Sequence, residues 1–228
     1  MGAKNIESRA RLHAALGDPG RLAIVDELKA SDRSPKELCD LLGFPSNLLA
    51  HHLDVLENAG AIERTRSDGD ARRRYVRLSA NMIDIVGPVE EPLPTEVLFL
   101  CTRNSARSQL AAALWRERTG CRARSAGTHV AEKVHPGAID AGRRAGLAIT
   151  GAVPKVLGSI PRGVQVITVC DLVHEELDAT TKWWHWSISD PVEPGRPAQF
   201  DAAVRELEER IARFTRATKI SNSKEGCR

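Results

Sequence analysis

Apolar residues recur at helical spacing through the first third of the chain. Four amphipathic helices are predicted there, and the pairs Asp18-Pro19, Ser34-Pro35 and Pro45-Ser46 are typical helix starts. Two strands of alternating pattern follow, around a predicted turn. The predicted helices are 5–16, 19–30, 35–42 and 45–58, the strands are 61–66 and 73–78, and the turn is 67–70. Two short helices followed by a hairpin indicate a winged helix-turn-helix domain.

After residue 95 the pattern changes to short apolar runs that alternate with amphipathic stretches. Strands are expected near 97–101, 122–126 and 164–170, and helices near 107–119, 136–145 and 198–216. This alternation is typical of an α/β domain with a parallel sheet. In such a fold the site lies at the carboxyl ends of the strands, where Cys101 and Cys170 both fall.

A Pro-rich, acidic stretch separates these two patterns, and it has the composition of a semi-rigid linker. We therefore predict a multidomain chain with an all-α, winged helix N-terminal domain and a second, α/β domain. The predicted boundaries are 1–87 for the first domain, 88–95 for the linker, 96–217 for the second domain and 218–228 for a flexible tail.

The strongest chemical signal is Cys101-Thr102-Arg103-Asn104-Ser105-Ala106-Arg107-Ser108, directly after an apolar strand and before a helix. Backbone N–H groups of such a loop can converge on an oxyanion, here with Thr102, Arg103, Ser105, Ala106 and Arg107 around it. Their field predicts a lowered pKa for the Cys101 thiol, and therefore a nucleophilic thiolate. Ser108 can donate a hydrogen bond to the sulfur. The alternative is a buried structural cysteine.

Residues 96–217 resemble the low-molecular-weight protein tyrosine phosphatase fold and, within it, the thiol-dependent arsenate reductases. The resemblance rests on the loop, with Asn104 and Gln109, and on Ser125–Thr128, His135-Pro136, Val166–Cys170 and Trp186–Pro191. It implies an α/β phosphatase-like domain in which Cys101 attacks the oxyanion and Arg107 binds it. It also implies that Asp190, before Pro191, is the general acid. Arg103 stands where the family usually has glycine.

The surroundings of Asp190 favour arsenate over phosphotyrosine as substrate. Val192-Glu193-Pro194 replaces the aromatic residues that the tyrosine phosphatases place after the Asp-Pro pair, and Tyr75 is the only tyrosine. The run Trp183–Trp186 is similar to the arsenate reductase branch, although packing alone would explain most of these tryptophans. A phosphatase, or a non-catalytic oxyanion or redox sensor that acts as a repressor, stays an alternative.

Arsenate reduction needs a thiol as electron donor. Cys170 matches the first resolving cysteine of thioredoxin-coupled arsenate reductases, but no further cysteine follows it over 171–178. Either Cys170 forms a disulfide with Cys101, or an external thiol of the mycothiol, glutathione or thioredoxin type attacks, with a redoxin as partner. Cys170 could also be a buried strand residue. Cys121 is expected to be structural, and Cys227 lies in the predicted tail.

Residues 8–80 resemble the ArsR/SmtB repressors in element order and in the stretches Glu37–Leu42 and His51–Gly60. The resemblance implies binding to an operator in double-stranded DNA. The residues expected to contact bases are Ser46, Asn47, Leu48, Ala50 and His51, and those expected to contact phosphates are Arg64, Arg66, Arg72, Arg73, Arg74 and Arg77. Residues 1–95 hold 13 basic against 15 acidic residues, so only local clustering in the wing favours DNA. A winged helix used for protein contacts is the alternative.

Metalloid sensing by the first domain has little support, because its one cysteine, Cys39, cannot supply three thiolates. Sensing could use Cys39 from each protomer of a dimer, which the resemblance implies, or Cys101 and Cys170, or it could be absent. No metal site, no bound cofactor, no signal peptide and no membrane span are predicted, and five unpatterned cysteines favour a cytoplasmic protein. The sequence thus predicts a DNA-binding regulator fused to an arsenate reductase.

Overall fold

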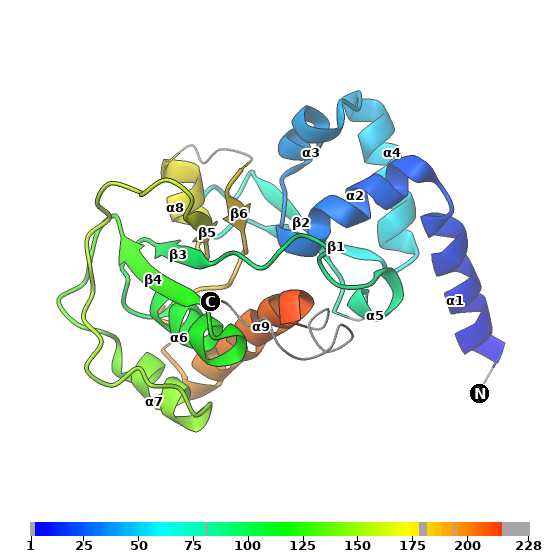
Figure 1. Cartoon of the computed structure of the whole chain (residues 1–228). Helices are drawn as coiled ribbons and strands as arrows, with labels where there is room; N and C mark the ends of the chain where they lie inside the picture. Colours follow the sequence, from blue (N-terminus) through cyan, green and yellow to red (C-terminus); the bar gives the residue numbers. More distant parts are fainter. Residues whose placement is uncertain (1–2, 81, 178–181, 194, 216–228) are drawn as a thin grey trace. The chain divides into compact units, whose positions relative to one another are not determined.

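The computed structural model describes residues 3–80, 82–177, 182–193 and 195–215, and it divides into two compact units (Figure 1). One unit comprises Met1–Ser67 and Ala71–Val89, and the other comprises the rest of the chain. The first unit is a helical domain with a hairpin, and the second carries a parallel sheet, so the predicted multidomain fold class is confirmed. In the described residues, no helix has the length and apolar character needed to cross a membrane.

The first unit follows the predicted order of helices and strands. Asp18 accepts a hydrogen bond from the backbone N–H of Arg21 at 2.9 Å, and Ser34 and Glu37 form a capping box. Gly43 ends the third helix in the left-handed conformation. The elements of the first unit are α1 (Ala3–Leu16), α2 (Pro19–Ala30), α3 (Pro35–Leu42), α4 (Ser46–Asn58), β1 (Ile62–Arg66), β2 (Arg74–Leu78) and α5 (Ile83–Val86).

A single apolar core joins the helices of this unit to its hairpin. Ile24 and Leu28 from α2, Leu38 from α3 and Leu56 from α4 are completely buried in it. β1 and β2 pair antiparallel, and Arg33 adds a short bridge to Val76 beside them. Helix-turn-helix and wing therefore form one packed body.

The second unit is built on a four-stranded parallel sheet with the order β4-β3-β5-β6. Helices α6, α7 and α9 pack together, and α6 covers β3 and β4, whereas α8 packs against β3 and β5. The elements are β3 (Glu96–Cys101), α6 (Arg107–Thr119), β4 (Arg122–Gly127), α7 (Pro136–Arg144), β5 (Gln165–Thr168), α8 (Asp171–Glu176), β6 (Trp184–His185) and α9 (Pro197–Thr215).

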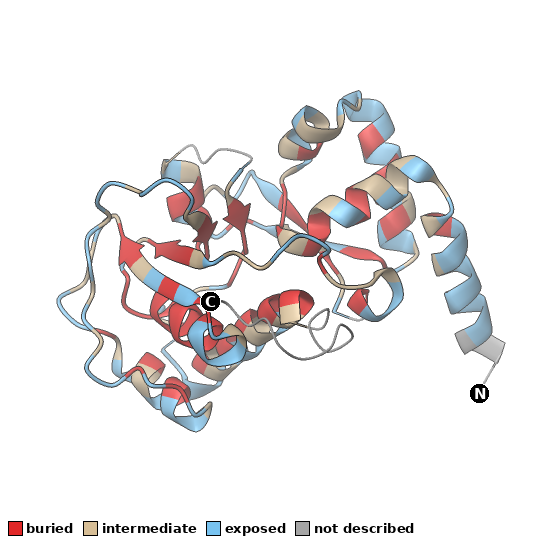
Figure 2. Cartoon of the chain, in the orientation of Figure 1, coloured by how far each residue is buried: buried red, intermediate tan, exposed pale blue. Residues whose placement is uncertain are grey.

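The central strand β3 is buried along nearly its whole length, and α6 is buried from Arg107 to Trp115, whereas the last turn of α6 is largely exposed (Figure 2). A parallel strand covered on both faces has to be apolar along its length, which explains the run before Cys101. Phe99, Trp115, Trp186 and Phe214 form an aromatic cluster between the sheet and α9. Trp186 thus has a packing role, as the pattern allowed.

Three short elements were missing from the prediction, namely α5, α8 and β6. The strand expected over 164–170 is shorter, because β5 ends at Thr168 and Cys170 becomes the N-cap of α8. Val169, between them, still donates its N–H to the carbonyl of Leu100 at 2.8 Å. Cys121 is buried directly before β4. The predicted tail, with Cys227, lies outside the described residues.

Candidate active site

The loop that follows β3 holds the proposed nucleophile. Cys101 is the last residue of β3, is 3% exposed, and is followed by a turn that leads into α6 at Arg107. Asn104 in this turn has a φ of 49°, a left-handed conformation that residues other than glycine seldom adopt. Its backbone N–H points at Cys101 Sγ, 3.2 Å away. The loop therefore curls around the sulfur as expected for an oxyanion cradle.

The Cys101 thiol does not have the lowered pKa that the sequence predicted. Burial of the sulfur raises its pKa, and the hydrogen bond with Ser108 and the charge of Arg107 only partly oppose this effect. Ser108 Oγ lies 3.0 Å from Cys101 Sγ. The prediction was wrong because the strand and loop exclude water more completely than the local motif indicates.

Arg107 and Asp190 form the cationic side of the site. Arg107 donates one hydrogen bond from Nη1 to the carbonyl of Ile188 at 2.9 Å and another from Nη2 to Asp190 Oδ2 at 2.7 Å. The other carboxylate oxygen of Asp190 accepts from the backbone N–H of Val192 at 2.8 Å. Burial lowers the pKa of Arg107, but the surrounding sulfur atoms and Asp190 raise it overall, so the group stays charged.

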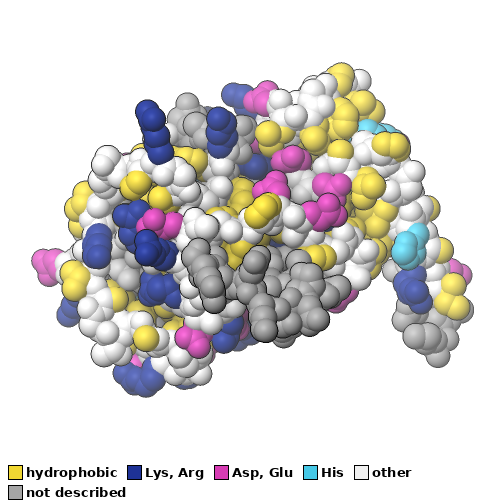
Figure 3. Space-filling view, in the orientation of Figure 1, with side chains coloured by type: hydrophobic (Ala, Val, Ile, Leu, Met, Phe, Trp, Pro, Cys, Tyr) yellow, Lys and Arg dark blue, Asp and Glu magenta, His cyan; other side chains and the backbone are white. Residues whose placement is uncertain are grey.

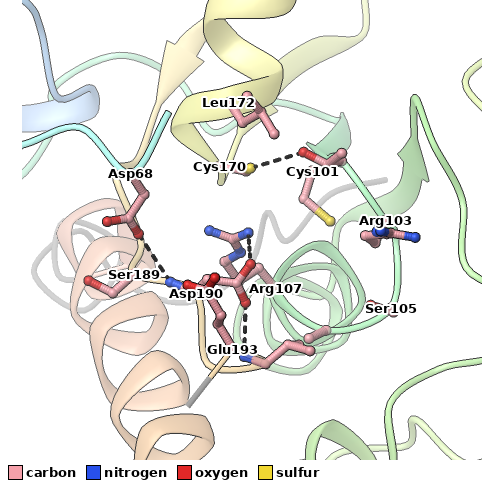
Figure 4. Close-up of a pocket in the computed structure, with 13 residues that line it drawn as sticks. Asp68, Cys101, Arg103, Ser105, Arg107, Cys170, Leu172, Ser189, Asp190 and Glu193 are labelled. Carbon is pink, nitrogen blue, oxygen red and sulfur yellow. Dashed lines mark hydrogen bonds and ion pairs between the residues drawn. The ribbon is translucent and has the colours of Figure 1, made fainter. Parts of the chain in front are cut away.

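Cys170 lies at the same edge of the sheet as Cys101, as the parallel strands predicted. It is buried, and its Sγ lies 3.3 Å from Thr102 Oγ1 at the start of the loop. Figure 4 shows Cys101, Cys170, Arg107 and Asp190 around one pocket. The second thiol is thus next to the nucleophile's loop.

The wall of this pocket contains no aromatic residue among the described residues from 90 on. The residues of this part of the chain that line it are Cys101, Thr102, Arg103, Ser105, Ala106, Arg107, Cys170, Leu172, Ser189, Asp190, Val192 and Glu193. All five residues predicted to surround the oxyanion are among them. Asn104, within the loop, and Ser108, in the first turn of α6, are fully buried.

Arg103 fits the loop without the backbone freedom of glycine. Among the described residues, Asn104 is the only residue other than glycine with a positive φ, so Arg103 avoids that region. Its carbonyl accepts a hydrogen bond from the N–H of Ala131 at 3.0 Å, and its side chain is exposed. Gly127 is the position that does require glycine, because a Cβ there would lie 2.6 Å from the carbonyl oxygen of Thr102.

A buried polar network behind Cys170 was missed from the sequence. Asp171 Oδ1 lies 3.0 Å from His185 Nε2, and Thr168 Oγ1 lies 2.9 Å from Nδ1 of both His185 and His174. Burial raises the pKa of Asp171, but the hydrogen bonds and charge of His185, with Ser187, lower it overall. The run Trp183–Trp186 contained one signal, a histidine within an apolar segment, but its partners lie on other elements.

The residues predicted to contact DNA bases lie on α4. Ser46, Asn47, Leu48, Ala50 and His51 are all exposed. Cys39, on α3, is partly exposed. The exposed side of α4 therefore presents the small, amide and imidazole groups that base edges can accept.

The wing arginines fall into two groups. Arg66 and Arg74 are exposed and directly opposite each other in the ladder, and Arg73 is exposed beside them. Arg64, by contrast, is paired with Asp54 at 2.7 Å and Glu57 at 3.1 Å, and Arg77 is paired with Glu63. Arg72 is exposed and has a partner of its own. Arg64 and Arg77 are thus engaged with carboxylates and less suited to phosphate contacts than the sequence indicated.

A cysteine and an arginine on one strand–loop–helix turn, with a carboxylate on the arginine, define a thiol-based oxyanion site on an α/β sheet. A winged helix occupies the other part of the chain. The chain belongs to the low molecular weight phosphotyrosine protein phosphatase family, whose model matches residues 96–224. Residues 16–65 match the model of a helix-turn-helix domain. The predicted fusion of the two domains is confirmed.

Individual relatives match one domain each. An arsenate reductase of Bacillus anthracis is 32% identical over 126 residues, which cover 52% of this chain and 92% of that protein. The HTH-type transcriptional repressor SmtB of Mycobacterium tuberculosis is 39% identical over 62 residues, which cover 27% of this chain and 46% of that protein. The chain thus spans about half the length of that repressor. The crystal structure of arsenate reductase from Archaeoglobus fulgidus is similar over 50% of this chain and 94% of that one, with 27% identity and a TM-score of 0.42.

Proposed function

We propose that the chain is a DNA-binding transcriptional regulator joined to a thiol-dependent arsenate reductase that acts through Cys101. The observation that carries this proposal is the pocket shared by the Cys101 thiol, the Arg107 guanidinium and the second thiol of Cys170. A phosphatase needs the first two groups, whereas a reductase also needs a thiol that delivers electrons. The sequence similarity to an arsenate reductase of Bacillus anthracis supports the same choice.

The first step forms a bond between Cys101 Sγ and the arsenic of arsenate. Arg107 and the loop N–H groups hold the arsenate oxygens. The proton of the Cys101 thiol passes to the Asp190 carboxylate, which the arsenate displaces from Arg107. Asp190 then gives this proton to the departing oxygen, which leaves as water. The product is a covalent thiol–arsenate adduct in which arsenic is still pentavalent.

In the second step a thiolate attacks Cys101 Sγ and forms a disulfide, while the S–As bond breaks and its electron pair stays on arsenic. Arsenite then leaves, and two thiol sulfurs have been oxidised for each arsenic reduced. Cys170 supports an internal route, because it lines the same pocket as Cys101 and its Sγ is 3.3 Å from Oγ1 of Thr102, the residue directly after Cys101. Alternatively, an external thiol of the mycothiol or glutathione type attacks the adduct, and a redoxin recycles it.

Two other functions use the same groups. A phosphatase acting on small or protein phosphates is supported by the family to which the chain belongs. The absence of an aromatic wall among the described lining residues speaks against phosphotyrosine. A non-catalytic oxyanion or redox sensor is supported by the raised pKa of Cys101, because a protonated thiol is a poor nucleophile.

The regulator half of the proposal rests on α4 and the wing. Two arginines placed directly opposite each other in a hairpin repel, so Arg66 and Arg74 cost stability unless an anion lies against them. Phosphates of double-stranded DNA supply that charge. We infer that α4 enters the major groove while the wing arginines contact the backbone, in a homodimer on an operator.

The test is arsenite production by the full chain with a panel of reductants: thioredoxin, glutathione or mycothiol, each with its redoxin. Cys101→Ser should abolish turnover, and Cys39→Ser, in the other unit, is the matched control. Loss of turnover in Cys170→Ser assigns the internal route, and retention assigns the external one. If no reductant yields arsenite, the reductase is refuted, and hydrolysis of a phosphate ester by the same preparation would identify a phosphatase instead.

Coupling between the two activities is tested separately. The affinity of the full chain for its operator is measured with arsenate, arsenite or thiol present. A shift in affinity that disappears in Cys101→Ser would show that the site in the second unit reports to the first. Unchanged affinity in every condition would refute coupling and leave the reductase untouched.

A further inference from the structure

The side-chain amide of Asn104 has a fixed orientation behind the loop. The backbone N–H of Lys155 can only donate, and it lies 2.8 Å from Asn104 Oδ1. Gln109 Nε2 lies 3.0 Å from the same oxygen. Two donors on Oδ1 leave Nδ2 facing Ser108 Oγ, 2.8 Å away. The amide of Asn104 is therefore a donor toward Ser108.

This orientation decides the direction of the hydrogen bond at the nucleophile. Ser108 Oγ accepts from Asn104 Nδ2, so its own proton is left for Cys101 Sγ at 3.0 Å. Asn104 and Ser108 are both 0% exposed, so solvent is not in contact with either side chain. The sulfur thus receives a directed hydrogen bond whose polarity begins at Gln109 and Lys155.

We propose that Gln109 is a positioning residue for the nucleophile, which it orients through Asn104 and Ser108. This inference rests on the proposed role of Cys101 as the attacking group. Gln109 is 7% exposed, and its Nε2 also lies 3.2 Å from the backbone carbonyl of Asn104 and 3.3 Å from that of Val153. Three oxygens around one nitrogen identify that atom as the donor.

The contacts of Gln109 also explain how Asn104 holds its unusual backbone. A left-handed residue other than glycine persists only where its surroundings fix it. Gln109 binds both the carbonyl and the side-chain oxygen of Asn104, while Lys155 binds the side chain from the other side. Gln109 lies in the first turn of α6, and side chains there lean toward the helix start.

Two variants separate the hydrogen bond from the packing. Gln109→Leu keeps a bulky side chain in the packing but removes the donor. Gln109→Glu keeps the length and places a carboxylate oxygen against the three acceptors that now surround Nε2. The second change should rotate the Asn104 amide or the new side chain, and it should turn the Ser108 hydroxyl away from the sulfur.

The controls are matched in chemistry. Gln165, at the start of β5, donates from Nε2 to the carbonyls of Val166 and Lys182, so Gln165→Leu removes a similar amide away from the loop. Lys155→Ala removes an exposed side chain but keeps the backbone N–H that binds Asn104. Neither control should change Cys101.

The measurement is the rate at which iodoacetamide alkylates Cys101 in the reduced full chain, taken at a series of pH values. Mass spectrometry of the peptide that contains Cys101 follows the reaction. We expect the midpoint to rise by about half a unit to one unit in Gln109→Leu, and by more in Gln109→Glu. Arsenate turnover near neutral pH should fall about three- to tenfold through kcat/KM. Gln165→Leu and Lys155→Ala should match the wild type.

A wild-type midpoint in both Gln109 variants would overturn the proposal. If Gln109→Leu unfolds at a lower temperature than Gln165→Leu, the nearly isosteric Gln109→Glu decides. The result is independent of the substrate. A shifted midpoint in a chain that never forms arsenite would refute the reductase and keep the positioning role, whereas normal turnover with an unshifted midpoint would refute the positioning role alone.

Discussion

The carboxylate of Asp190 is paired with the guanidinium group of Arg107, which an incoming oxyanion needs. Its Oδ2 lies 2.7 Å from Arg107 Nη2, and its Oδ1 is held by the N–H of Val192. Asp190→Asn removes the negative charge and keeps an oxygen for Val192. We therefore expect the variant to bind oxyanions more tightly, although it has lost the proposed proton donor.

The size of the effect follows from the geometry of the pair. A hydrogen bond to a charged group contributes about 1.5–3 kcal/mol. The Asp190 side chain is 39% exposed, so screening by solvent reduces this to about 1–2 kcal/mol. An oxyanion that no longer displaces Asp190 should bind roughly 5- to 30-fold more tightly. Turnover should fall by about 10²- to 10⁴-fold, because general acid catalysis is lost.

Calorimetric titration with inorganic phosphate measures the dissociation constant without turnover. Glu193→Gln is the control, because Glu193 is an exposed carboxylate of the same pocket. Its loss changes the charge of the rim but frees no guanidinium. If phosphate binds Asp190→Asn no more tightly than Glu193→Gln, the idea of competition for Arg107 is wrong.

Three further outcomes test other parts of the molecule. Gly127→Ala should cut turnover at least about tenfold, because its Cβ meets the backbone of the loop rather than a flexible side chain, and a wild-type rate would contradict this. Alkylation of wild-type Cys101 should accelerate as pH rises, with a midpoint above the ordinary pKa of a thiol, because burial raises the pKa of Cys101. A midpoint below the ordinary thiol pKa would contradict the burial argument. Arg66→Ala and Arg74→Ala should each weaken binding to any DNA sequence and lower the slope of log affinity against log salt concentration by about one unit. Arg64 is already paired with Asp54, so Arg64→Ala should change the affinity and the slope less.

The elements that the sequence predicted well are those whose signals are local. The helices over 19–30, 35–42 and 107–119 have the predicted bounds, because caps or glycines mark their ends. The loop at Cys101 was recognised because nucleophile, cation and helix start share one short stretch. Short elements such as α8 and β6 have too few residues to show a period.

The parts that could not be predicted depend on long-range packing. Arg107 and Asp190 are 83 residues apart, so no spacing rule pairs them. The bond from the Lys155 N–H to Asn104 comes from a backbone group, which carries no sequence signal at all. The predicted direction of the Cys101 pKa shift was wrong for the same reason, since burial is a property of the assembled sheet and helices.

Asp190 and the proposed role of Gln109 affect the pKa of Cys101 in opposite directions. Asp190 neutralises Arg107 and so reduces the stabilisation of the thiolate by the guanidinium charge, whereas Gln109 orients the hydrogen bond from Ser108 that stabilises the thiolate. Asp190→Asn should therefore lower the alkylation midpoint of Cys101, and Gln109→Leu should raise it. Because no hydrogen bond among those described links the two routes, the shifts should add in the double variant to within a few tenths of a unit. A double variant that keeps the midpoint of either single variant would mean that both changes act through one shared movement of the loop.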